Sequence, residues 1–430
     1  MRRRKFTGSI LILLIAFLLG IPAVYNLPPI QERLGWRVAE LFARFKYALS
    51  PPEQIVFVPE EESMLLNQTA SPESTPSAPL SVTTTQIPFT KQPVDSLARP
   101  TTTLTPIPKS IQLDGVQHEY QTWNNCGPAT LAMALSYWGW EDDQRPIAAF
   151  TKPNPRDKNV MPYELADYVD EETRFKIVSR LGGEIELLKR FIAAELPVII
   201  EKGFEGRDLE GWMGHYVLVT GYSDQDQTFT FQDSYYGPNQ VMDYADLESY
   251  WRAFSFTYLV VYPDERREEI ETILGPHMDE EYNYRYAAQK ASDDFYVVTD
   301  RDQFFAWFNR GTNLVQLQDY ASAAAAYDEA FALYPAIPEK ERPWRMMWYQ
   351  TGPYWAYYYT GRYQDVINLA TTTLDTMSEP VLEESYYWRA LAREALGDTE
   401  RAIKDLRSAL KYHPGFEPAL TQLQQLGVTP

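Results

Sequence analysis

The C-terminal third of the chain carries a helix–turn–helix pattern that recurs with a period of about 34 residues. One unit begins at Phe304 and another near Glu383, and the stretch 361–363 (Gly-Arg-Tyr) marks a more degenerate turn between them. Small residues at 311, 323 and 390 would let paired helices approach closely. A single hairpin of this kind cannot bury its apolar face, so neighbouring hairpins must stack. Residues 303–430 are therefore predicted to form an all-α array.

Three other kinds of sequence precede this array. Residues 111–263 mix helical and strand-like patterns, which predicts an α+β domain. Residues 264–302 are rich in charge and are expected to be a partly helical connecting segment. Residues 51–110 hold eleven prolines and several Ser/Thr-rich runs. Because such a composition buries too little apolar surface to offset its ordering entropy, we expect an extended linker there.

The N-terminus has the pattern of a membrane anchor. Residues 1–5 read MRRRK, and an almost uninterrupted apolar run follows from Phe6 to Tyr25. About 20 apolar residues span a bilayer core, and flanking basic residues stay on the cytoplasmic side. Residues 1–28 are thus predicted to be a transmembrane signal anchor with the body of the protein outside the cytoplasm. Cleavage as a signal peptide, which would release a secreted protein, is the alternative.

A second N-terminal feature follows the predicted anchor. Residues 29–49 place apolar side chains at helical spacing with basic residues between them, as in an amphipathic helix. Such a helix could rest on the outer membrane face or pack on the protein itself. Together with the linker it forms the predicted segment 29–110.

Composition limits the functions that this chain can have. The net charge is −20, and because residues 1–50 carry +6, the remainder carries −26. An acidic body repels nucleic acid, so no nucleic-acid partner is expected. The single cysteine excludes an intramolecular disulfide, and the four histidines form no HExxH or HxH pair. The sequence therefore predicts neither a metal centre nor an organic cofactor.

The residues around that one cysteine indicate chemistry. Cys126 stands just before Gly127 and Pro128, and the apolar residues that follow recur on one helical face. Proline suits the first turn of a helix, so Cys126 is predicted to lie at a helix N-terminus. The partial positive charge there stabilises a thiolate. Gly127 would leave room for a substrate backbone beside the sulfur, whereas an isolated cysteine is more often an inert core residue.

A base for this thiol is available in a predicted hairpin. His215 opens a buried strand that runs to Tyr222, and Thr228–Asp233 reads as the returning strand. If Tyr222 pairs with Thr228, Asp233 lies opposite Val217 and diagonal to His215. A carboxylate in that position can orient the imidazole and favour its charged form.

The combined motifs resemble those of C39-like, papain-like cysteine peptidases, and the helical array resembles tetratricopeptide repeats. The peptidase resemblance rests on the NNCGPA stretch, the GHYVLVTGY strand and the Asp-Ser-Tyr-Tyr-Gly-Pro turn. It implies that Gln121, five residues before Cys126, donates to the oxyanion. Four further residues are expected to line the substrate cleft or, in the case of the tryptophans, simply to pack: Trp123, Gly127, Trp212 and Gly214.

Together with the predicted anchor, the resemblance implies a membrane-anchored, extracytoplasmic cysteine peptidase that acts through Cys126, His215, Asp233 and Gln121. Its substrate would be a peptide or protein, and the repeats would contact that substrate or a partner protein. Two alternatives stay open. The domain could be an inactive relic in a repeat-based binding scaffold, or the same residues could serve an amidase or transferase that acts on cell-wall peptides.

Overall fold

The computed structural model of the chain describes residues 41–60, 106–205 and 211–430. The predicted anchor at residues 1–28 lies outside these ranges, as does most of the predicted linker. Within the ranges that are described, no helix combines the length and the apolar character that crossing a membrane requires.

An antiparallel sheet of seven strands forms the centre of the first domain, here called the sheet domain. The strand order is β2-β7-β3-β4-β5-β6, and β1 pairs with the far end of β4. The strands are β1 (Ser110–Gln112), β2 (Lys176–Arg180), β3 (Val198–Glu205), β4 (Trp212–Ser223), β5 (Thr228–Asp233), β6 (Gly237–Asp243) and β7 (Tyr258–Tyr262). The long central strands β3 and β4 are buried almost throughout, and this burial includes the charged residues Glu201 and Lys202 as well as the apolar runs 198–200 and 216–219.

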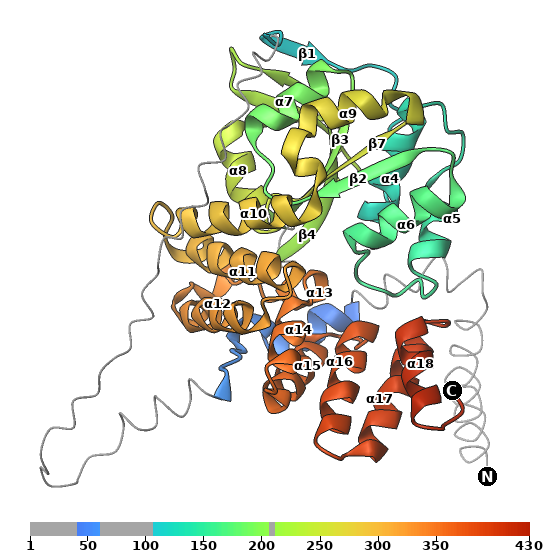
Figure 1. Cartoon of the computed structure of the whole chain (residues 1–430), viewed down its shortest axis with the longest axis vertical. Coiled ribbons are helices and arrows are strands. Elements are labelled where there is room, and N and C mark those ends of the chain that lie inside the picture. The colour runs from blue at the N-terminus through green and yellow to red at the C-terminus, as the bar shows by residue number, and fades with distance from the viewer. Residues whose placement is uncertain (1–40, 61–105, 206–210) are drawn as a thin grey trace, which may run out of the picture.

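Helices cover both faces of the sheet (Figure 1). Successive residues along a strand point to opposite faces of the sheet. Ile199 and Leu218 pack against one group of helices, whereas Ile200 and Val217 pack against the other. The first group is α4 (Cys126–Tyr137), α5 (Gln144–Thr151) and α6 (Pro162–Glu172). The second is α7 (Ile185–Ala193), α8 (Tyr244–Arg252) and α9 (Arg267–Leu274).

Helix α4 differs from the amphipathic helix that its sequence suggested. Every residue from Gly127 to Ser136 is buried, including those off the predicted apolar face. The sheet covers one side of the helix, and α5 and α6 cover others, so no side of α4 is left for water. A helix of this kind is held rigidly at its N-terminus, where Cys126 lies.

The rest of the chain is helical, as predicted for the repeats. The helices are α10 (Glu280–Asp294), α11 (Asp300–Gln316), α12 (Tyr320–Leu333), α13 (Met346–Tyr349), α14 (Gly352–Tyr359), α15 (Tyr363–Thr376), α16 (Glu383–Ala395), α17 (Thr399–Tyr412) and α18 (Glu417–Gln425). A Cβ on Gly311 would lie 2.6 Å from the Tyr327 ring, so only glycine lets α11 and α12 approach this closely. Pro353 lies in the first turn of α14, where proline replaces no hydrogen bond and causes no kink.

Two segments that sequence patterns left outside the folded domains are packed. Helix α9, in the predicted connector, contributes Ile270 and Leu274 to the core of the sheet domain. Residues 51–60, at the start of the predicted linker, lie against the repeats through Phe57, whose ring contacts Phe331 at 5.0 Å between centroids. The expectation of an extended linker from residue 51 is therefore wrong for residues 51–60, because this part carries apolar side chains that the repeats bury.

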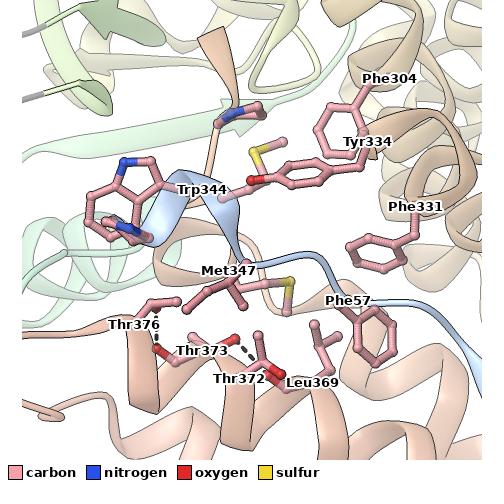
Figure 2. A pocket seen from close by; sticks show the side chains of 14 residues that line it. Phe57, Phe304, Phe331, Tyr334, Trp344, Met347, Leu369, Thr372, Thr373 and Thr376 are labelled. Carbon is pink, nitrogen blue, oxygen red and sulfur yellow. Dashed lines mark hydrogen bonds between the residues drawn. The ribbon is translucent and has the colours of Figure 1, made fainter. Parts of the chain in front are cut away.

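The helix at residues 41–49 meets the repeats on one side only. Tyr47 packs edge-on against Trp344 at 5.3 Å, and Lys46 donates to the Asp375 carbonyl at 2.7 Å. The opposite side presents four apolar side chains that are 66–70% exposed: Leu41, Phe42, Phe45 and Leu49. Figure 2 shows the apolar pocket that the following residues form with the repeats, between Phe57, Phe331, Trp344 and Met347.

Candidate active site

Cys126 is the first residue of α4 and is partly exposed. The turn before it is held from inside by Gln144, which is 3% exposed and whose Oε1 accepts hydrogen bonds from the Thr122 amide and from Asn125 Nδ2. Asn124 occupies the left-handed region at φ 54°, and its side chain donates to the Asp157 carbonyl at 3.1 Å. These contacts place the thiol where the helix begins and its backbone N–H groups have no intrahelical partner.

His215 lies on β4 between two groups with which it interacts. Its Nε2 is 2.9 Å from Oδ1 of Asp233, and its side chain also contacts the thiol of Cys126. Because the carboxylate accepts the Nε2 proton, Nδ1 is the nitrogen left for the sulfur. The three residues therefore form a continuous chain of side chains from α4 through β4 to the end of β5.

Asp233 is held in its charged form. Burial disfavours the carboxylate, but the hydrogen bond from His215 and two from the backbone amides of Tyr235 and Tyr236 outweigh it and lower the pKa of Asp233 to about 2. The buried anion in turn favours an imidazolium. Although burial opposes this charge, the contacts with Asp233 and Cys126 raise the pKa of His215 above its usual value.

The thiol responds in the opposite sense. Burial disfavours the thiolate, yet the interaction with His215 lowers the pKa of Cys126 below its usual value. A second cation contributes: Lys152 is 4% exposed and donates to the Asn124 carbonyl at 2.9 Å, directly before the thiol turn. The arrangement can thus hold a thiolate–imidazolium pair near neutral pH.

Gln121 is held against Ser234, the residue that follows Asp233. Its backbone amide donates to the Ser234 carbonyl at 3.0 Å, and its side-chain Oε1 accepts from the Ser234 hydroxyl at 2.9 Å. With Oε1 occupied, the Nε2 group is the part of the amide left to donate to a ligand. Sequence patterns alone did not single out Ser234, although it stands next to Asp233 in the same turn.

The predicted cleft residues divide into two groups. Trp123 is partly exposed beside the thiol turn, with the Lys158 ammonium 4.5 Å from its ring. Trp212, in contrast, is 1% exposed and stacks on Phe254 at 5.8 Å, inside the contact between the sheet domain and the repeats. For Trp212 the packing alternative is therefore the one that the structure shows.

The two glycines also face the interior. A Cβ on Gly214 would lie 2.6 Å from Phe254 and 3.0 Å from the ring of Tyr349, which belongs to α13. A Cβ on Gly127 would meet the Tyr216 ring and Val160 at 3.4 Å. Gly214 therefore allows the repeats to pack behind the site, whereas a Cβ on Gly127 would make only ordinary van der Waals contacts with its neighbours. Neither glycine opens space for a substrate where its side chain would point.

Two buried groups near the site were not predicted to be there. His118 has both ring nitrogens buried and lies close to Gln232 and Asp233. Glu201 on β3 is 3% exposed, and burial, with the nearby Cys126, raises its pKa well above the usual range and so favours its neutral form. Nothing in the local sequence marks either residue, because Glu201 is placed by strand pairing and His118 by the loop that follows β1.

A cysteine at a helix N-terminus, a histidine on a neighbouring strand and a carboxylate that orients it are the arrangement of side chains that thiol hydrolases use. Comparison with protein families agrees with that class. Residues 110–259 match the model of the Peptidase_C39 like family, and residues 304–337 and 384–415 match tetratricopeptide repeat models. The chain therefore carries a C39-like peptidase domain followed by tetratricopeptide repeats, which confirms the resemblance recognised from its motifs.

Solved structures and curated proteins add less. A protein assigned as a C39-like peptidase from Bacillus anthracis is 18% identical, with a TM-score of 0.30, over 36% of this chain and 98% of that one. The peptidase domain of Streptococcus ComA, a bifunctional ABC transporter of a quorum-sensing pathway, is 17% identical, with a TM-score of 0.27, over 35% of this chain and 99% of that one. No curated protein matches the chain.

Proposed function

We propose that this protein is a cysteine peptidase that hydrolyses peptide bonds through Cys126, His215, Asp233 and Gln121. The observation that carries the proposal is the position of His215, which contacts Cys126 on one side and Asp233, at 2.9 Å, on the other. An inert core cysteine needs neither a buried imidazole nor a carboxylate that orients it.

The reaction follows from this geometry. The Cys126 thiolate attacks the scissile carbonyl carbon, and the negative charge moves to the carbonyl oxygen. Gln121 Nε2 and the backbone N–H of Cys126 are the donors proposed for that oxyanion. The His215 imidazolium gives its proton to the departing amine, which leaves a thioester on Cys126. His215 then takes a proton from water, the hydroxide adds to the thioester, and the thiol is released with the acid.

Reactivity of the thiol tests this proposal directly. An iodoacetamide-type or epoxide probe should label Cys126 faster than a free thiol at pH 6, and His215→Ala should abolish the advantage. His277→Ala is the matched control, because His277 lies outside the site. Labelling at the rate of a free thiol, or labelling that His215→Ala leaves unchanged, would show that the domain is an inactive member that serves as a scaffold.

The nature of the acceptor separates a peptidase from a transferase. Both would form the same thioester, so peptide libraries should be digested with and without an added amine. We expect the free acid as the only product. A new amide formed with the amine would instead identify a transferase.

We also propose that the protein is anchored in the cell membrane with its body outside the cytoplasm. The support is the basic start, the apolar run from Phe6 to Tyr25, and the apolar side of the helix at residues 41–49. If a phosphatase that works only outside the cytoplasm is fused after residue 430, we expect cells that make the fusion to show phosphatase activity. The mass of the exported protein then distinguishes an uncleaved anchor from a cleaved signal peptide, and an inactive fusion would reject export.

The repeats are proposed to hold the substrate or a partner protein through an aromatic surface. Trp355 and Tyr359 on α14 are 37% and 53% exposed, and Trp355 packs on Trp388 of α16 at 4.7 Å. Tyr320 of α12 stacks on Tyr359 at 4.4 Å. Exposed rings backed by other rings are rigid, amphipathic contact groups of the kind enriched in binding surfaces.

A further inference from the structure

A second cluster of side chains lies where the peptidase-like domain meets the repeats. Glu164 belongs to the first turn of α6, Glu383 is the first residue of α16, and His413 follows the last residue of α17. One potential ligand atom from each of these three side chains lies within 4.8 Å of the other two. No motif joins them, since 219 residues of sequence separate Glu164 from Glu383.

One carboxyl oxygen in this cluster, Oε2 of Glu383, is buried without a hydrogen-bond partner among the described residues. Glu383 is 3% exposed, and its Oε1 lies 2.6 Å from Nδ1 of His413. A carboxyl oxygen that is buried without a partner is costly, so Oε2 points to a ligand that completes its surroundings.

The acidic side chains around the cluster also favour a bound cation. The charged side chains that act on Glu164 are those of Glu384, Asp157 and Asp167, and those that act on Glu383 are Asp157 and Glu164, so all of them are acids. The nearby lysines, Lys152 and Lys158, act on Asp157 instead. A cation among Glu164, Glu383 and His413 would offset the repulsion and satisfy the buried oxygen.

The donor atoms indicate which cation fits. Imidazole nitrogen together with carboxylate oxygen suits Zn²⁺, whereas Mg²⁺ and Ca²⁺ prefer sites made only of oxygen. We propose that Glu164, Glu383 and His413 bind one Zn²⁺ ion that joins the peptidase-like domain to the repeats. The site is separate from the thiol chemistry, so its existence does not depend on peptidase activity.

Zinc stoichiometry in the full chain tests the proposal. The chain should carry Cys126→Ser, which removes the thiol as a competing zinc ligand, and should be stripped with a chelator and desalted. After one equivalent of Zn²⁺ and gel filtration, elemental analysis should find one zinc per chain, and the thermal midpoint should rise. Glu164→Gln and His413→Ala should each weaken zinc binding at least about 100-fold and abolish the rise.

Matched controls keep the result interpretable. Glu379→Gln removes an acid that pairs with Arg156 across the same contact, and His277→Ala removes a partly buried histidine elsewhere. Both should retain zinc. Glu164→Gln preserves the shape of the side chain, and its helical circular dichroism verifies that it has folded. No zinc retained, equal retention in the Glu164 and His413 variants, or equally tight Ca²⁺ binding would each overturn the proposal.

Discussion

The imidazole Nε2 of His215 lies 2.9 Å from Oδ1 of Asp233, although the hairpin that joins them begins one residue away from the predicted register. Ser223 pairs with Thr228, one residue away from the pairing of Tyr222 with Thr228 that the sequence suggested. A β-bulge between Val219 and Gly221 then absorbs one residue, and from Val219 opposite Phe231 the strands follow the predicted register. The bulge therefore restores the contact that the slipped turn would have lost.

Asp233→Asn should narrow the pH range of activity. The carboxylate raises the pKa of His215, so its loss should lower that pKa and with it the pH above which the imidazolium is lost. The basic limb of the kcat/KM profile should move to lower pH, and kcat should fall by about 10²-fold or more. The profile and the pH dependence of Cys126 alkylation should shift together. A basic limb that stays in place would mean that Asp233 does not act on His215.

The same substitution should change stability in a pH-dependent way. The pKa of Asp233 falls from the ordinary 3.8 to about 2 in the folded chain, which corresponds to about 2 kcal/mol. Because the folded pKa is depressed, this stability is present above pH 4 and is lost as the pH falls through 2. Urea unfolding should show Asp233→Asn to be less stable by about 2 kcal/mol at pH 6, with the difference vanishing near pH 2. A constant difference would assign the loss to packing.

Gln121 and Ser234 should affect turnover without affecting thiol reactivity. Gln121→Ala removes the proposed oxyanion donor, so kcat should fall about 10²–10³-fold with little change in KM. Ser234→Ala frees the Gln121 amide to rotate and should cause a smaller loss of the same kind. Alkylation of Cys126 forms no oxyanion, so its rate should match that of the unsubstituted protein in both variants. If the alkylation rate falls together with kcat, Gln121 instead serves to hold the turn that positions Cys126.

Features of this structure can be predicted from the sequence when they depend on residues close together in the chain, and not when they depend on contacts between distant segments. Cys126 at the start of a helix and His215 on a buried strand follow from patterns a few residues long, and the structure has both. The predicted proximity of Asp233 to His215 is correct only because a β-bulge compensates for the error of one residue in the predicted turn. Gly221 allows β1 to lie close at that point, since a Cβ there would lie 2.8 Å from the Ile111 carbonyl oxygen. That contact spans 110 residues and no local pattern reports it.

Trp212 and Gly214 pack against the repeats, where the sequence had offered a place in the cleft wall for both and simple packing as the alternative for Trp212. In sequence they stand beside His215, which suggested a cleft wall. In the structure Tyr349 and Arg345 reach them from more than 130 residues away, and Arg345 donates to the Trp212 carbonyl at 2.7 Å. The repeats thus cover the strand end that would otherwise be open. Docking between domains is encoded in complementary surfaces, which a periodicity analysis does not detect.

Gly214→Ala tests this packing. The added methyl would approach the rings of Phe254 and Tyr349 within 2.6–3.0 Å, so we expect the free energy of unfolding to fall by about 1–3 kcal/mol. Combining it with Tyr349→Leu should recover part of the loss, because the smaller side chain frees one of the two contacts. Additive losses in the double variant would show that the two residues do not meet.

The aromatic surface of the repeats gives the last prediction. If Trp355 and Tyr359 hold the substrate away from the reacting bond, their loss weakens ground-state and transition-state binding equally. Trp355→Ala with Tyr359→Ala should therefore raise KM about tenfold or more for a long peptide while kcat stays constant. A short peptide that cannot span the domains should show no change. Tyr296→Ala is the control, since Tyr296 is 90% exposed and lies outside this surface. An equal KM for the long peptide would assign the surface to a partner protein, which pull-down with the same double variant would then test.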